Sequence, residues 1–148
     1  MKMTPPNEPR GQSMVEFALI VPIFVLVVVG LFDAGRAIYA FNTIQNASRE
    51  AVRLAIVNQN DSAIEAEAIA AAVGLGIQAS DVIVTVREGD FATGGTGTCS
   101  ASPDIGCVIE VAVNYTYTAA TPVVGTLMGS IPMTGQSRQP IEFAFESP

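Results

Sequence analysis

An uninterrupted apolar run near the N-terminus constrains this 148-residue chain more than any other feature. The sixteen residues from Phe17 to Phe32 carry no charge, and counting from Met14 gives nineteen residues of which only Glu16 is charged. A membrane-spanning helix needs about 20 predominantly apolar residues, so the run is just long enough to cross a bilayer. Because a carboxylate in hydrocarbon is costly, the position of Glu16 at the start of the run requires an explanation.

Composition excludes several classes of function. The formal net charge is −7 and the sequence pI is about 4.3, so a nucleic-acid partner has no electrostatic support. The chain contains no histidine, which removes the commonest general base and the commonest transition-metal ligand. A hydrolase would then need paired carboxylates, a Ser-Lys arrangement or a cysteine nucleophile, and the only lysine, Lys2, precedes the apolar run. We therefore expect no enzymatic activity, no cofactor and no metal site.

Charged residues beyond the apolar run are interpreted as solvated. Arg36, Arg49 and Arg53 are accompanied by Asp33 and Glu50, which indicates a solvated helix face rather than a phosphate-binding stripe. The carboxylates that flank later strands and loops are interpreted in the same way, namely Glu88, Asp90, Asp104 and Glu110.

The two cysteines, Cys99 and Cys107, lie in a segment rich in glycine, serine and threonine. Their spacing matches no zinc motif, and two thiolates alone rarely hold a structural zinc ion. In an exported domain they are expected to form a disulfide that closes a short loop, whereas in the cytosol both would remain reduced.

The polar leader and the apolar run allow three interpretations. Residues 1–11 contain three prolines and should form a disordered leader. A cleaved secretory signal would need a small-residue cleavage site, and the residues after the run, DAGRAIYAF, offer no good one. An uncleaved anchor would leave Glu16 snorkelling at the membrane edge. The charge bias does not settle orientation, because basic residues lie on both sides of the run.

The third interpretation rests on the residues around Gly11. Arg10 and Gly11 are followed by four residues, then by Glu16, Phe17 and the apolar run. This order resembles the type IV prepilin signal, in which a membrane aspartyl peptidase cuts after the glycine and the new N-terminus is usually methylated. The resemblance implies that Gln12 starts the mature chain and that Glu16 is its fifth residue. In a helical filament, a buried carboxylate at this place can pair with the amino terminus of a neighbouring subunit and fix the axial register.

The resemblance extends to residue 55. The start G-Q-S-x-V-E-F-A-L, Pro22 within the apolar run, FDAGRAIYAFN, and N-A-x-R-E-A-x-R at residues 46–53 together resemble the TadE-like family of tight-adherence (Flp-type, type IVc) pilus systems. The resemblance implies a minor pilin or pseudopilin that is processed after Gly11 and takes part in pilus assembly. The implied partners are the prepilin peptidase, other pilins or pseudopilins and the inner-membrane assembly platform.

The implied location is the bacterial inner membrane, which the chain would span once, with its C-terminal domain on the extracytoplasmic side. A second implied location is the pilus itself, into which the protein would be incorporated. The alternative is an unprocessed, single-pass envelope protein whose small exposed domain binds a partner.

Periodicity predicts one long helix followed by a small mixed domain. Amphipathic spacing after Asp33 predicts a helix from Ser13 to Val57 whose second half leaves the membrane. An alanine-rich segment predicts a short helix from Ala63 to about Val73. Alternating residues predict strands at 81–88 and 108–118, the second with one solvated face formed by Glu110, Asn114 and Thr116.

The remaining segments complete an α+β domain of pilin-like architecture. Their composition predicts a loop at 89–106, a short helix or turn covering the sheet at 121–130, and one or two edge strands at 131–145. The expected organisation is a leader at 1–11, a transmembrane part at 12–33, and an extracytoplasmic domain at 34–148 whose antiparallel sheet packs on the exposed half of the long helix.

Overall fold

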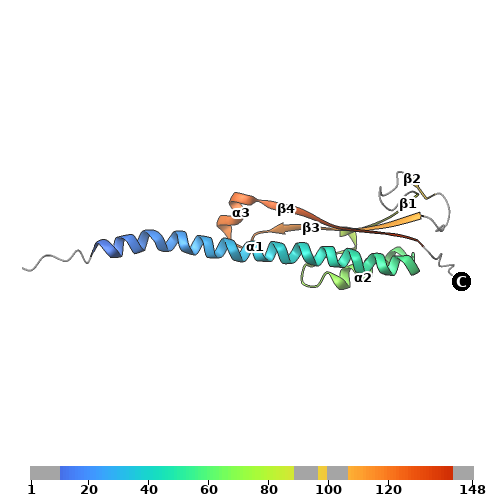
Figure 1. Cartoon of the computed structure of the whole chain (residues 1–148), viewed down its shortest axis with the longest axis horizontal. Coiled ribbons are helices and arrows are strands. Elements are labelled where there is room, and N and C mark those ends of the chain that lie inside the picture. Colours follow the sequence, from blue (N-terminus) through green and yellow to red (C-terminus); the bar gives the residue numbers. More distant parts are fainter. Residues whose placement is uncertain (1–10, 89–96, 100–106, 142–148) are drawn as a thin grey trace, which may run out of the picture.

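The computed structural model describes residues 11–88, 97–99 and 107–141. Helix α1 extends the length of the molecule, and the other elements gather along its second half (Figure 1). In chain order the elements are α1 (Gln12–Val57), α2 (Asp61–Ala71), the 3₁₀ turn η1 (Ala79–Asp81), β1 (Val82–Glu88), β2 (Gly97–Thr98), β3 (Cys107–Thr118), α3 (Pro122–Met128) and β4 (Ser130–Pro140). The predicted α+β class is confirmed: a long apolar N-terminal helix packs against a short helix and an antiparallel sheet.

Helix α1 is a single helix, as its periodicity predicted, and it contains Pro22. None of the side chains from Gln12 to Phe32 is buried, whereas the second half buries one face. The buried residues of that face recur every three or four positions and are mostly small: Ala40, Ile44, Ala47, Ser48, Ala51, Val52 and Ala55. Small side chains at this spacing let the sheet and α2 approach the helix closely.

Within the described residues the sheet has four strands in the order β2-β1-β3-β4, and every neighbouring pair is antiparallel. Strand β4 is the edge strand that Pro132 and Pro140 predicted, since proline cannot donate a ladder hydrogen bond. The loop prediction for residues 89–106 is wrong at Gly97–Thr98, which pair with the end of β1 as strand β2. The rest of that predicted loop lies outside the described residues.

The core lies between the sheet and the second half of α1. Strand β3 contributes Ile109, Val111 and Val113, all fully buried, and α2 contributes Ile64 and Ala68. Helix α2 begins two residues earlier than the predicted Ala63, because the Asn60 side chain caps it by accepting a hydrogen bond from the Ala63 amide.

Two predictions about the sheet are wrong. The second face of β3 is not uniformly solvated, because Glu110 is buried, although Thr116 is exposed. Helix α3 forms where a short helix was predicted, but it lies beyond the end of the sheet, beside the apolar part of α1, instead of covering the sheet (Figure 1). The reason lies in the contacts of Asp33, described below.

Candidate functional site

The predicted processing residues lie at the very start of α1. The helix begins at Gln12, directly after Gly11, and all four predicted residues, Gly11, Gln12, Glu16 and Phe17, are exposed. Residues four apart share a helix face, so Gln12 and Glu16 are neighbours, and Gln12 Nε2 donates a hydrogen bond of 3.2 Å to Glu16 Oε1. The structure thus brings the predicted first residue of a mature chain next to the carboxylate.

The apolar run after Glu16 is uncovered by the rest of the chain. Phe17, Leu31 and Phe32 are each at least 70% exposed, and the helix carries a stretch long and apolar enough to cross a membrane. An apolar surface of this extent marks contact with lipid or with partner helices. The described domain leaves this part of α1 available for such contacts.

Asp33 ends the apolar run and anchors the last part of the domain to α1. The residue is 4% exposed, and its carboxylate accepts hydrogen bonds from the Ala120 amide (3.1 Å), the Thr121 amide (3.3 Å) and the Thr121 hydroxyl. Its backbone carbonyl accepts a 2.8 Å hydrogen bond from the Tyr117 hydroxyl. These contacts hold the turn between β3 and α3 against the helix, which explains where α3 lies.

The interpretation of Asp33 as part of a solvated helix face is therefore wrong. Arg36 lies 3.9 Å from its carboxylate, but the stronger partners come from residues more than 80 positions later. Burial, followed by the negative charge of Asp33, raises the pKa of Tyr117 above its ordinary value. Two sequence signals could have indicated this contact: the acid at the end of the run, and Thr121-Pro122, a typical helix start.

Replacing Asp33 by alanine is expected to release this anchor. The Ala120 and Thr121 amides would lose their acceptor, so their hydrogen-exchange protection should fall roughly tenfold or more. The matched control is Glu50→Ala, because Glu50 also pairs with an arginine three positions later on α1, at 3.6 Å. Exchange mass spectrometry of the full chain in micelles would decide: equal protection at residues 120–121 in both variants would contradict the anchor.

The predicted disulfide cysteines lie at the far end of the sheet from Asp33. The structure joins Cys99, which follows β2, to Cys107, the first residue of β3, with their Cα atoms 6.3 Å apart. Cys107 is buried, and it pairs with Glu88 in the β1–β3 ladder. A disulfide here is typical of a domain outside the reducing cytosol.

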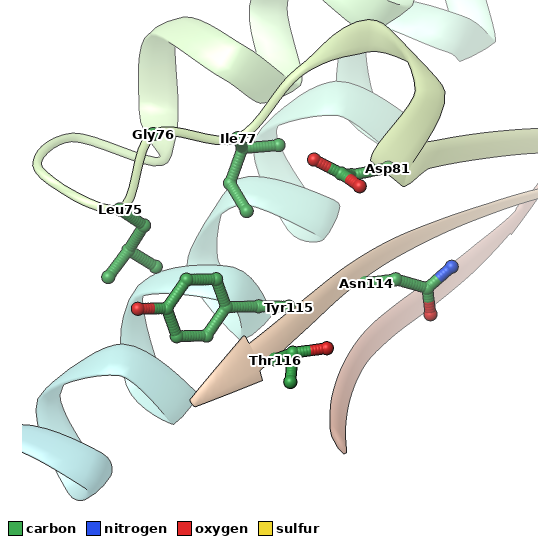
Figure 2. A pocket seen from close by; sticks show the side chains of 7 residues that line it. All are labelled: Leu75, Gly76, Ile77, Asp81, Asn114, Tyr115 and Thr116. Atoms are coloured by element: carbon green, nitrogen blue, oxygen red, sulfur yellow. The ribbon is translucent and has the colours of Figure 1, made fainter. Parts of the chain in front are cut away.

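A cavity of about 250 Å³ lies between the connection after α2 and the end of β3. Figure 2 shows the Tyr115 ring below Leu75, with Ile77 and Asp81 on the other side of the hollow. The Asp81 carboxylate accepts a 2.9 Å hydrogen bond from the Gln78 backbone amide, and this bond stabilises the 3₁₀ turn η1. Among the described residues, no three histidine, cysteine or acidic side chains gather as a metal site would require.

Comparison with known proteins gives one match. Searches of curated proteins and of solved structures found no match. The model of the family described as TadE-like protein matches residues 11–53, which cover α1 from the residue before its start almost to its end. That family is of the pilin type and is generally non-enzymatic. Residues 11–53, which include the hydrophobic part of α1, are therefore similar to the TadE-like family.

Proposed function

We propose that this protein is a minor pilin or pseudopilin that takes part in assembly of a tight-adherence type IV pilus, after cleavage by a prepilin peptidase between Gly11 and Gln12. The observation that carries the proposal is that three features begin within a few residues of one another. The TadE-like match begins at Gly11, the helix begins at Gln12, and the uncovered apolar surface begins within the first turns of that helix.

The surroundings of Gly11 support cleavage at this point. Gly11 is exposed, and a Cβ placed on it would meet no atom of the described residues within 4 Å, so the described domain does not cover this position. The helix that follows is long enough to hold the bond at a membrane surface, where a membrane peptidase acts.

Glu16 is proposed as the assembly residue. In the single chain its hydrogen-bond partner among the described residues is the neutral Gln12 side chain, which does not balance a carboxylate charge. Inside an apolar bundle an unbalanced carboxylate is strongly disfavoured, so a cation is needed there. The α-amino group of Gln12, freed by cleavage and belonging to a neighbouring subunit, would supply that cation and set the axial register.

The remaining assignments follow from this proposal. Residues 12–33 would span the inner membrane once, and residues 34–148 would form the extracytoplasmic domain, where the Cys99–Cys107 disulfide is stable. The partners would be the prepilin peptidase, other pilins or pseudopilins and the inner-membrane assembly platform. The apolar surface of α1 would pass from contact with lipid to contact with neighbouring helices during assembly.

Two substitutions separate processing from assembly. In Gly11→Ala the processed fraction should fall to near zero, because the prepilin signal that residues 10–17 resemble has glycine before the cleaved bond. In Glu16→Ala most chains should still start at Gln12 but should be nearly absent from pili, since the register-setting charge is lost. The readouts are intact mass and N-terminal peptide mapping of membrane and pilus fractions. Ser13→Ala, an exposed neighbour, is the control and should behave like the unmodified chain.

Each other outcome would overturn a defined part of the proposal. An unmodified chain that keeps residues 1–11 in its native membranes would favour the static envelope anchor. Cleavage beyond Asp33 would identify a secretory signal and remove the filament argument. Normal piliation in both Gly11→Ala and Glu16→Ala would exclude the assembly role of these two residues.

A further inference from the structure

We infer that α3 enters the bilayer beside α1 as a second, non-spanning apolar element that contacts lipid acyl chains in the leaflet nearest the C-terminal domain. This inference rests on the membrane insertion of α1 in the proposed function. It goes beyond that function, because it assigns a membrane contact to residues 122–128, which lie far outside the family match.

The position of α3 relative to the apolar run carries the inference. Asp33 binds the turn that precedes α3, so the helix starts at the level where the charge-free run ends. Thr121, Pro122 and Val124 then line a groove of about 470 Å³ against α1, whose wall is formed by Pro22, Val25, Leu26 and Val29. At 1.5 Å per residue, Val29 and Val25 lie about 6 and 12 Å from Asp33 toward the N-terminus of α1. If those residues lie in hydrocarbon, the side of α3 that faces them does so too.

The chemistry of α3 fits hydrocarbon. No charged residue occurs between Glu110 and Arg138, a stretch that includes all of α3. Leu127 and Met128 are 80% and 63% exposed on the free surface of the domain. The Thr126 hydroxyl donates a 2.9 Å hydrogen bond to the Pro122 carbonyl, which satisfies its donor within the helix. Pro122 has no N–H, so the first turn presents one donor fewer to an environment without water.

An exposed tyrosine lies at the level at which the domain would meet the membrane surface. The chain has three, Tyr39, Tyr115 and Tyr117, and all belong to the end of the domain nearest Asp33. The Tyr117 hydroxyl binds the Asp33 carbonyl, and the Tyr39 hydroxyl binds the Val73 carbonyl at 3.4 Å. Tyr115 lies beside Leu75, two residues after Val73 (Figure 2). Tyr39 is 56% exposed and is therefore the tyrosine that can meet the bilayer interface, where this residue type is enriched, whereas Tyr117 is buried and holds α1 to β3.

Lipid is the occupant that these observations favour. The groove continues the apolar surface of α1 that a bilayer must cover in any inserted form, and it opens on the same side of Asp33 as that surface. The exposed Leu127 and Met128 add further apolar surface on α3 itself. A short apolar helix at this depth lies in the interfacial region and adds buried apolar area to the anchor.

Tryptophan fluorescence tests the inference, because the natural chain contains no tryptophan. Single substitutions at exposed positions, Leu127→Trp, Val27→Trp and Val57→Trp, report on α3, on the span and on the far end of α1. Each full-length variant is reconstituted in phosphatidylcholine vesicles with brominated acyl chains, which quench tryptophan on contact. We expect Leu127→Trp to lose emission about as strongly as Val27→Trp, and Val57→Trp to lose little. Met128→Trp should repeat the result from the neighbouring exposed position.

The other outcomes are distinguishable. Quenching of Val27→Trp without quenching of Leu127→Trp or Met128→Trp would overturn the inference and leave the insertion of α1 intact. Absence of quenching at Val27 would contradict insertion itself, and the inference would fail with it. A blue-shifted but unquenched Leu127→Trp emission would indicate that protein covers α3, which would replace lipid by a neighbouring chain.

Discussion

Replacing Gly135 by alanine is expected to destabilise the domain by about 3 kcal/mol, at the upper end of the range for overpacking. Gly135 is buried in β4 where this strand crosses α1, and a Cβ there would overlap the Ile44 carbonyl group and approach the Gln45 amide nitrogen to 2.8 Å. These are backbone atoms, so no side chain can rotate away, and the strand must move from the helix. Such a shift would also stretch the 3.4 Å hydrogen bond from Gln45 Nε2 to the Thr134 carbonyl.

Thermal unfolding of the full chain in micelles would measure the effect, and we expect the Tm to fall by roughly 10 °C. The matched control is Gly35→Ala, the same substitution on α1 where a Cβ meets nothing within 4 Å. Alanine favours a helix over glycine by about 0.5–1 kcal/mol, so the control should keep or raise the Tm. An unchanged Tm in Gly135→Ala would contradict the close approach of β4 to α1.

The sequence predicted the elements whose signals are local. Helix α1 repeats its buried residues every three or four positions from Ala40 to Ala55, and the apolar residues Ile109, Val111 and Val113 alternate along β3 and are fully buried. Both patterns reflect one face packed on a core, so they are visible without tertiary information. The edge position of β4 followed from Pro132 and Pro140, because proline excludes a central strand.

The sequence did not predict the contacts that join distant segments. Asp33 meets Ala120 and Thr121 across more than 80 residues, and Gly135 meets the backbone of Ile44 across about 90. Neither contact leaves a periodic pattern, since each depends on how β4 and α3 dock on α1. The processing residues are a different case, because Gly11 and Glu16 were identified from the spacing of the prepilin-like signal. The structure places both at the start of α1, and their roles in cleavage and assembly stay predictions.

Replacing Arg138 by methionine is expected to destabilise the sheet by about 2–3 kcal/mol. Glu110 was predicted to be solvated, yet its side chain is 9% exposed on the outer face of β3, and Arg138 is its direct partner on β4 in the strand register. Arg138 Nε donates a 2.6 Å hydrogen bond to Glu110 Oε2, and Gln136 donates to Oε1. Removing one partner of a fully buried ion pair costs about 3–5 kcal/mol. We expect a smaller loss of stability here, because the Arg138 side chain is 35% exposed and Gln136 still donates a hydrogen bond to the Glu110 carboxylate.

A double variant separates the loss of the pair from the loss of packing. In the double variant Glu110→Gln with Arg138→Met, the buried carboxylate that would lack its arginine partner is also removed. Denaturant unfolding in micelles should therefore show that the double variant regains most of the stability lost in Arg138→Met alone. The matched control is Arg87→Met, an exposed arginine on β1 in the same sheet, which should change stability by less than about 0.5 kcal/mol. If Arg138→Met and Arg87→Met unfold alike, the pair contributes no more than a solvated surface contact. If the double variant is no more stable than Arg138→Met, the arginine stabilises the edge strand through its aliphatic chain rather than through its charge.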